Sequence, residues 1–429
     1  MTDIDSRDLA RRWRKAPDHR SVATAVLFTR LGVALLPLIQ LRVGPQLTAS
    51  DSLLAIALVC WAAVVIRRPT ARRAAIPFAL VAGLVSAGLC VTSLYHPDNP
   101  PESFANALKV CFSLFVVGGV ITCAVAIGRD LAGLAWAYCL GSALATLSAL
   151  LRIGGAEAVY QAGDNTRLAG LAGNPVGLAI SAGVALAILF HLRPSGRLGP
   201  AVQIILIVLN VTGIIVAIGL TGAVIAVFGT LVGQFYIPNV ARAFRRASAL
   251  FVLAIAFLVA NSRWDLFTTI SERFTGALNP SQGISTAGGS NGSTLSLRLY
   301  TWQISLDRIG QHPFVGNGFD DSGQLSYGTV DTHNYFLLSW QTGGLLMLTI
   351  ALILFVLSIL AAVRLWKMRK VFSVPYIVAA LAATWPGAMS SPALYGRSLY
   401  FVIALAVSAA FVGRQLLAQS SPEVSASPL

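Results

Sequence analysis

The sequence predicts an all-α membrane protein with about twelve membrane-spanning helices. Only 11% of its 429 residues are charged, whereas a soluble domain carries about 25%. The mean hydropathy is +0.73. Twelve mostly apolar runs come close to the roughly 20 residues that a spanning helix needs. This composition excludes a water-soluble globule, and it also excludes intrinsic disorder, which requires few apolar residues and high net charge.

The twelve runs follow one another along nearly the whole chain. They cover residues 22–40, 52–66, 74–95, 106–127, 131–151, 174–192, 201–219, 220–236, 249–260, 346–363, 374–390 and 398–413. The chain therefore divides into a basic tail (1–21), spans one to nine (22–260), a long polar loop (261–345), spans ten to twelve (346–416) and a second tail (417–429).

The distribution of charge predicts the orientation in the membrane. If both tails are cytoplasmic, the cytoplasmic segments hold 21 of the 31 Lys and Arg residues, and the external loops hold 11 of the 17 Asp and Glu residues. Because Lys and Arg in short loops resist translocation, this asymmetry places both termini inside. The net charge of +14 is thus a topological signal that calls for no nucleic-acid partner. The cytoplasmic cations are expected to contact anionic lipid headgroups.

Two external loops, 152–173 and 261–345, are longer than the other connections. Loops beyond about 15 residues usually carry function or disorder. Within the second loop, residues 297–309 place apolar side chains at helical spacing, and 313–318 (PFVGNG) form a turn cluster. We expect a short external helix, then this turn, then an amphipathic helix that starts at His333 and leads into the tenth span.

His333 is the candidate general base, because it lies where the long loop re-enters the membrane. A neutral imidazole can accept a proton from an attacking hydroxyl. Asn334 and the nearby acidic residues are candidates for orienting its ring. All five cysteines lie in apolar runs, so we predict no disulfide framework and no cysteine metal site. No metal and no cofactor are expected.

Two external arginines are candidate anion ligands. Arg167 opens the stretch RLAGLAGNP, in which a cation precedes glycine-rich backbone, Asn174 and the start of the sixth span. Guanidinium groups and backbone N–H groups at a helix start both bind anions. Arg298 opens the predicted external helix and shares a face with Trp302, four residues later. Two cations from separate loops would suit a pyrophosphate.

These patches together resemble the O-antigen ligase and O-antigen polymerase superfamily. The resemblance rests on His333 followed by ten residues and Gly344, on Arg298-x-x-x-Trp302 with Pro313-x-x-Gly316-x-Gly318, and on Arg167 through Gly173-Asn174-Pro175. It implies a GT-C-like membrane fold and a metal-independent, inverting glycosyltransferase in the bacterial inner membrane. The implied donor is a glycan on undecaprenyl pyrophosphate, presented at the periplasmic face.

The resemblance also implies roles for the three candidates. His333 would deprotonate the acceptor hydroxyl, and Arg298 and Arg167 would bind the pyrophosphate and stabilise its charge as it leaves. One departure concerns an arginine that many members carry near the external start of the eighth span. This chain has Gly219-Leu220-Thr221-Gly222-Ala223 there. Arg263 or Arg397 is a candidate replacement for that charge.

Several functions remain open. Ligases attach a finished chain to lipid A–core, and polymerases extend the growing glycan. A single dominant external loop favours a ligase, with a polymerase or an exopolysaccharide enzyme as the alternative. A flippase or transporter is the alternative class. Transporters usually place ionisable groups within their spans, whereas the predicted spans hold Arg30 and Lys109 but no Asp or Glu.

Overall fold

The computed structural model describes residues 20–41, 47–94, 100–153, 159–162, 165–194, 196–217, 220–237, 294–319, 332–369, 374–391, 394 and 396–420. For residues 69–77, 100, 159–162, 165–166, 220, 294–298, 300 and 414–420 it describes the backbone alone. The described chain is almost entirely helical, as the composition predicts.

Each apolar run predicted within these residues forms a helix. The helices are α2 (Arg20–Ala34), α3 (Ala49–Ile66), α4 (Pro69–Ser93), α5 (Pro100–Cys111) with its continuation through the π-helical η1 (Phe112–Val117) and α6 (Gly118–Ala126), α7 (Leu131–Leu150), α8 (Pro175–Leu189), α9 (Gly199–Val216), α10 (Leu220–Phe235), α13 (Thr294–Gln311), α14 (Tyr335–Met368), α15 (Pro375–Met389) and α16 (Arg397–Ser420). The ninth predicted run, 249–260, lies outside the described residues.

Five of these helices are long and apolar enough to cross a membrane. They are Ala49–Ile66, Pro101–Ala126, Leu131–Leu150, Gly199–Val216 and Tyr335–Met368. Shorter apolar helices accompany them at Phe78–Ser93, Pro175–Leu189, Thr221–Phe235 and Arg397–Gly413. The chain is therefore a polytopic helical membrane protein, while the number of twelve spans stays a prediction.

One β-hairpin departs from the all-α prediction. Strands β1 (Val159–Ala162) and β2 (Asn165–Leu168) pair antiparallel inside the predicted loop 152–173, with Tyr160 opposite Arg167. A 3-10 turn, η3 (Gly170–Ala172), follows. Strands of four residues are too short for their alternating pattern to be distinguished from a loop in the sequence.

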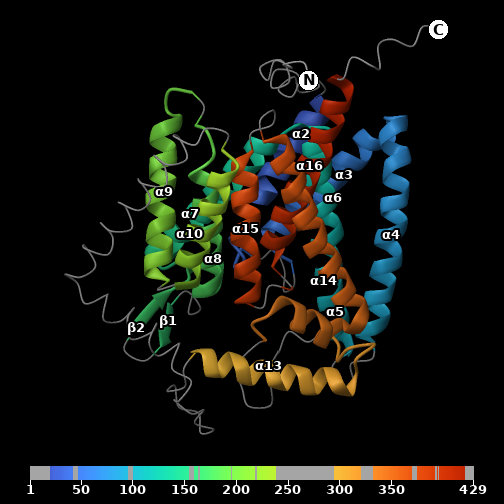
Figure 1. Ribbon diagram of the computed structural model, residues 1–429, viewed down its shortest axis with the longest axis vertical. Helices are drawn as coiled ribbons and strands as arrows, with labels where there is room; N and C mark the ends of the chain where they lie inside the picture. The colour runs from blue at the N-terminus through green and yellow to red at the C-terminus, as the bar shows by residue number, and fades with distance from the viewer. Residues whose placement is uncertain are drawn as a thin grey trace.

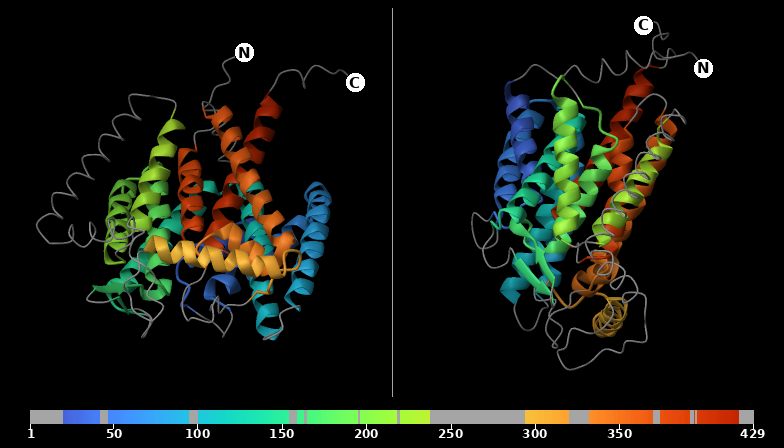
Figure 2. Two further views of the ribbon diagram at one scale, coloured as in Figure 1. Left: turned by 60° about the horizontal axis from the view of Figure 1, so that its bottom comes forward. Right: turned by 90° about the vertical axis from the view of Figure 1, so that its left-hand side faces the viewer.

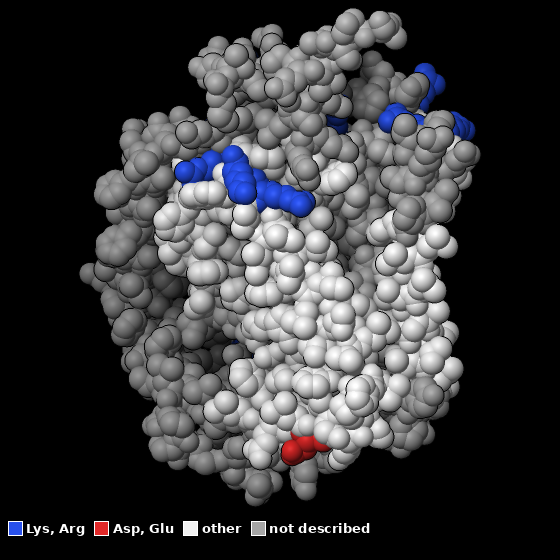
Figure 3. Space-filling model, turned by 45° about the vertical axis from the view of Figure 1, so that its right-hand side comes forward, with Lys and Arg blue, Asp and Glu red and all other residues white. Residues whose placement is uncertain are grey.

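The helices form a bundle with two different ends (Figure 1). Helix α13 lies across one end, where β1 and β2 also lie, whereas α2 begins and α16 finishes at the opposite end. The right-hand view of Figure 2 shows α13 almost end-on beneath the bundle. We call these the α13 end and the terminal end. On the face in Figure 3, the described Lys and Arg residues gather toward the terminal end and an acidic residue lies at the other.

Small residues let three central helices pack closely. A Cβ on Gly222 of α10 would overlap the carbonyl of Ala179 in α8, and a Cβ on Gly229 would lie 2.6 Å from the carbonyl oxygen of Ala379 in α15. Such contacts suit helices in lipid, where van der Waals packing rather than the hydrophobic effect holds neighbours together.

Helix α14 is interrupted where the sequence predicts the junction between an amphipathic helix and the tenth span. Gly343 (φ −112°, ψ 17°) and Gly344 (φ 61°, ψ −153°) are not helical. The predicted turn at 313–318 docks on this break: the N–H of Asn317 donates to the carbonyl of Gln341 at 2.7 Å, and the N–H of Gly318 to that of Thr342 at 3.0 Å. Both predicted helices, 297–309 and the one leading into the tenth span, are confirmed.

Candidate functional site

Helix α13 is joined to the start of α14 beside His333. Thr332, 5% exposed, forms a hydroxyl–hydroxyl bond with Ser305 of α13 and donates to Oε1 of Gln341 at 3.1 Å. The indole N–H of Trp340 donates to the carbonyl of Pro313 at 2.9 Å. These bonds hold the residue before His333 between two helices, and His333 itself is half-buried.

The two asparagines predicted as supporting residues act as helix caps. Oδ1 of Asn334 accepts the N–H groups of Phe336 and Leu337 at 3.0 and 3.2 Å, which starts α14. Oδ1 of Asn174 accepts the N–H of Gly177 and starts α8. The carbonyl oxygen of Asn334 thus serves as a helix cap, and the role of Asn334 in orienting the His333 ring stays a prediction. Because Asn334 caps α14, His333 lies directly before the start of this helix.

Arg298 and Trp302 lie on α13, as predicted. Arg298 precedes Ser305 by seven residues, or about two turns of the helix. One side of α13 is turned toward the protein, because Thr301, Ser305 and Ile309 are 0%, 1% and 4% exposed. The indole nitrogen of Trp302 is buried and has no hydrogen-bond partner among the described residues.

Arg167 lies on β2, and its guanidinium reaches the end of another helix. Its Nε donates to the carbonyl of Ala217 at 2.9 Å, just beyond α9. The next described residue is Leu220, where α10 begins. This is the junction at which the resemblance led us to expect an arginine, and Arg167 places a cation there. The bend after β2 is fixed by a bond from the N–H of Leu171 to Oγ of Ser148 in α7.

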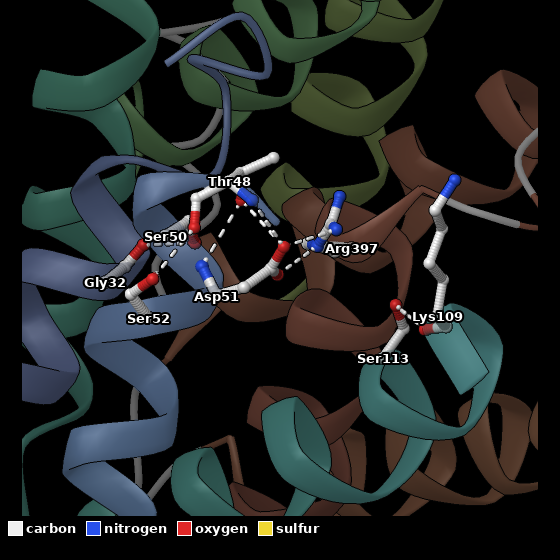
Figure 4. A network of polar contacts seen from close by, with 8 residues as sticks. All are labelled: Gly32, Thr48, Ser50, Asp51, Ser52, Lys109, Ser113 and Arg397. Atoms are coloured by element: carbon white, nitrogen blue, oxygen red, sulfur yellow. Dashed lines mark hydrogen bonds and ion pairs between the residues drawn. The ribbon is translucent and has the colours of Figure 1, made fainter. Parts of the chain in front are cut away.

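Arg397 is paired with a buried carboxylate (Figure 4). Its Nε and Nη2 donate to Oδ1 and Oδ2 of Asp51 at 2.5 and 2.6 Å. Asp51 is 2% exposed and lies in the first turn of α3, which starts at Ala49. Arg397 is therefore not the unpaired replacement cation that the sequence left open. Arg263 lies outside the described residues.

The helices also contain more ionisable groups than the sequence suggested. Asp51 belongs to α3, and Asp130, at the start of α7, pairs with Arg30 of α2 through bonds of 2.5 and 2.6 Å. Both carboxylates were assigned to loops because apolar runs do not show where a polar first turn begins. Each is bound to an arginine. Lys109 lies in α5, and Oγ of Ser113 donates to its carbonyl (Figure 4).

The α13 end thus gathers most of the predicted site. His333 and α13 are linked through Thr332 and Ser305. Arg167 lies on the hairpin at the same end (Figure 1). In the described ranges, no three His, Cys, Asp or Glu side chains gather in a way that could hold a metal ion.

Comparison with known proteins does not extend the resemblance. No family model and no curated protein matches this chain. What stands is its class, a polytopic helical membrane protein with polar residues gathered at one end of the bundle.

Proposed function

We propose that this protein is a membrane glycosyltransferase. It would transfer a glycan from undecaprenyl pyrophosphate to an acceptor hydroxyl at the periplasmic face, with lipid A–core as the preferred acceptor and a growing glycan as the alternative. The observation that carries the proposal is the junction of α13 with α14, where Ser305 bonds to Thr332 beside His333. It ties the proposed base to the helix that bears Arg298.

Glycan transfer needs a base near the acceptor hydroxyl and cations near the leaving pyrophosphate. His333 accepts the proton of the acceptor hydroxyl as its oxygen attacks the anomeric carbon. The bond from that carbon to the pyrophosphate breaks, and the electron pair leaves with the lipid pyrophosphate. Arg298 and Arg167 stabilise the negative charge that gathers on the phosphate. Attack from the face opposite the leaving group inverts the anomeric carbon.

The spacing along α13 supports this division of labour. Seven residues separate Arg298 from Ser305, which corresponds to about 10 Å along a helix axis. A sugar with its pyrophosphate extends over a similar length. Arg167 supports the same arrangement, because it brings a second cation to the junction of α9 and α10 through its bond to Ala217.

The charge distribution supports a periplasmic location for this end. Helix α14 runs from the site to the terminal end, where it carries Arg364, Lys367 and Arg369 in its last turns. Cationic residues favour the cytoplasmic side. With the terminal end cytoplasmic, the α13 end faces the periplasm.

The first test is replacement of His333 by alanine. We expect glycan transfer to fall to background while the protein still inserts in the membrane, because only a proton acceptor has been removed. His312→Ala is the matched control, since His312 is an exposed histidine just beyond α13. Normal surface polysaccharide in the His333→Ala strain would contradict the proposal.

Deletion of the gene distinguishes the candidate reactions on a polysaccharide gel. Carrier-linked polymer without long chains on lipid A–core indicates a ligase, and a single-repeat product indicates a polymerase. Donor that accumulates on the cytoplasmic leaflet indicates a flippase and contradicts a transferase.

A further inference from the structure

Both carboxylate oxygens of Asp51 accept hydrogen bonds. Oδ2 accepts the N–H and the hydroxyl of Thr48, each at 2.9 Å, in addition to Nη2 of Arg397, and Oδ1 accepts Nε of Arg397. Thr48 also accepts the N–H of Asp51, which completes a capping box at the start of α3. With its lone pairs occupied and its side chain buried, Asp51 holds the guanidinium plane of Arg397 in one orientation.

This clamp leaves one edge of Arg397 facing outward. Among the described residues no recorded bond engages Nη1, and Figure 4 shows the third guanidinium nitrogen directed away from Asp51. The arginine side chain keeps 14% exposure. Two geminal N–H donors are therefore presented at a fixed position.

Arg397 lies near the segment of His333. It is the first residue of α16. One turn later, the hydroxyl of Tyr400 donates to the carbonyl of Leu394 at 2.8 Å, so it accepts from Tyr335 across 3.5 Å. Tyr335 follows His333 by two residues. The hydroxyls of these two buried tyrosines therefore join the start of α14, two residues after His333, to the first turn of α16.

The charge of the pair indicates what it binds. Asp51 offsets the positive charge of Arg397 at contact distance, so a phosphate gains little attraction from the pair compared with an arginine that lacks such a partner. Two oriented N–H donors without net charge suit an uncharged oxygen. In a site for a lipid-linked glycan, the uncharged oxygens are the hydroxyl and acetamido oxygens of the sugars.

We propose that Arg397, held by Asp51, is a carbohydrate-binding residue that donates through Nη1 to an oxygen of the transferred glycan. This inference rests on the proposed function, and it separates sugar recognition by Arg397 from pyrophosphate binding by Arg167 and Arg298.

The test uses Arg397→Lys in the full-length protein in lipid nanodiscs. Lysine keeps an ion pair with Asp51 but lacks the outward N–H groups. Two probes are compared: bare undecaprenyl pyrophosphate, and the glycan-linked carrier isolated from the native membranes. We expect affinity for the glycan-linked carrier to fall about tenfold, the loss of one hydrogen bond, with affinity for the bare carrier within about twofold of the unmodified protein.

Arg30→Lys is the matched control, because Arg30 makes the same two-bond pair with Asp130 at the α6–α7 connection. It is expected to change neither affinity. Equal loss for both probes in Arg397→Lys would show a phosphate contact and overturn the inference, as would unchanged binding of the glycan-linked carrier. If the unmodified protein binds neither probe, the proposed function itself fails. Thermal unfolding of each variant separates these outcomes from misfolding.

Discussion

Replacing Gly344 by alanine is expected to loosen the junction between α13 and α14. Gly344 has φ 61° and ψ −153°, a backbone region that is essentially restricted to glycine and costs other residues about 1–3 kcal/mol. A Cβ at this position would also overlap the carbonyl of Phe314. Because the carbonyl of Phe314 belongs to the backbone, the turn at 313–318 must shift to make room for the Cβ.

The size of the effect follows from the bonds that the turn makes. The N–H groups of Asn317, Gly318 and Leu345 donate to the carbonyls of Gln341, Thr342 and Phe314 at 2.7, 3.0 and 3.1 Å. Each is worth about 1 kcal/mol. Together with the backbone strain, their loss destabilises the junction by on the order of 4–6 kcal/mol.

Hydrogen exchange measures this loss at the three amides, and a glycan-transfer assay measures its consequence for activity. We expect fast exchange at residues 317, 318 and 345 and at least about a hundredfold slower transfer, the effect of a misplaced catalytic group. Gly310→Ala in α13 is the control, since a Cβ there meets nothing within 4 Å. If Gly344→Ala behaves like Gly310→Ala in both measurements, the junction does not position His333.

Two other substitutions test the ion pair and the proposed phosphate contact. Asp51→Ala leaves the guanidinium of Arg397, which is only 14% exposed, without its partner, so we expect about 3 kcal/mol of destabilisation in thermal unfolding. The double variant Asp51→Leu/Arg397→Met should lose less stability than Asp51→Ala alone. If its loss of stability equals the sum of the losses in the two single variants, the two side chains are not coupled. Arg298→Lys should slow glycan transfer about 10- to 100-fold, because an ammonium group cannot reproduce a bidentate fork. Equal rates with Lys and Arg would remove Arg298 from the pyrophosphate site.

Local signals in the sequence were enough for most of the helices. Each apolar run within the described residues forms a helix. Helical spacing between 297 and 309 predicted α13. The break at Gly343 and Gly344 was not predicted, because a helix was expected to run from His333 into the tenth span. Each signal depends on neighbouring residues, because helix formation and capping are decided within a few turns.

The candidate site was only partly predictable. The segments of His333 and Arg298 were chosen as candidates because of their positions in the sequence. The bond between Thr332 and Ser305 joins the residue before His333 to the helix that bears Arg298. The capping role of Asn334 was not predicted, although a side chain that follows a loop and precedes a helix can accept the free N–H groups of that helix. Asp51 was set aside as a loop residue, and nothing near it in the sequence indicates an arginine partner.

The sequence by itself determined that this is a membrane protein. It also determined which parts of the chain form helices and which loops carry polar residues. Only the tertiary structure decided which charges neutralise one another. It pairs Asp51 with Arg397 across 346 positions and brings Arg167 to the carbonyl of Ala217. The reason is physical: helix formation responds to neighbours along the chain, whereas an ion pair depends on how distant helices pack, and no local pattern encodes that distance.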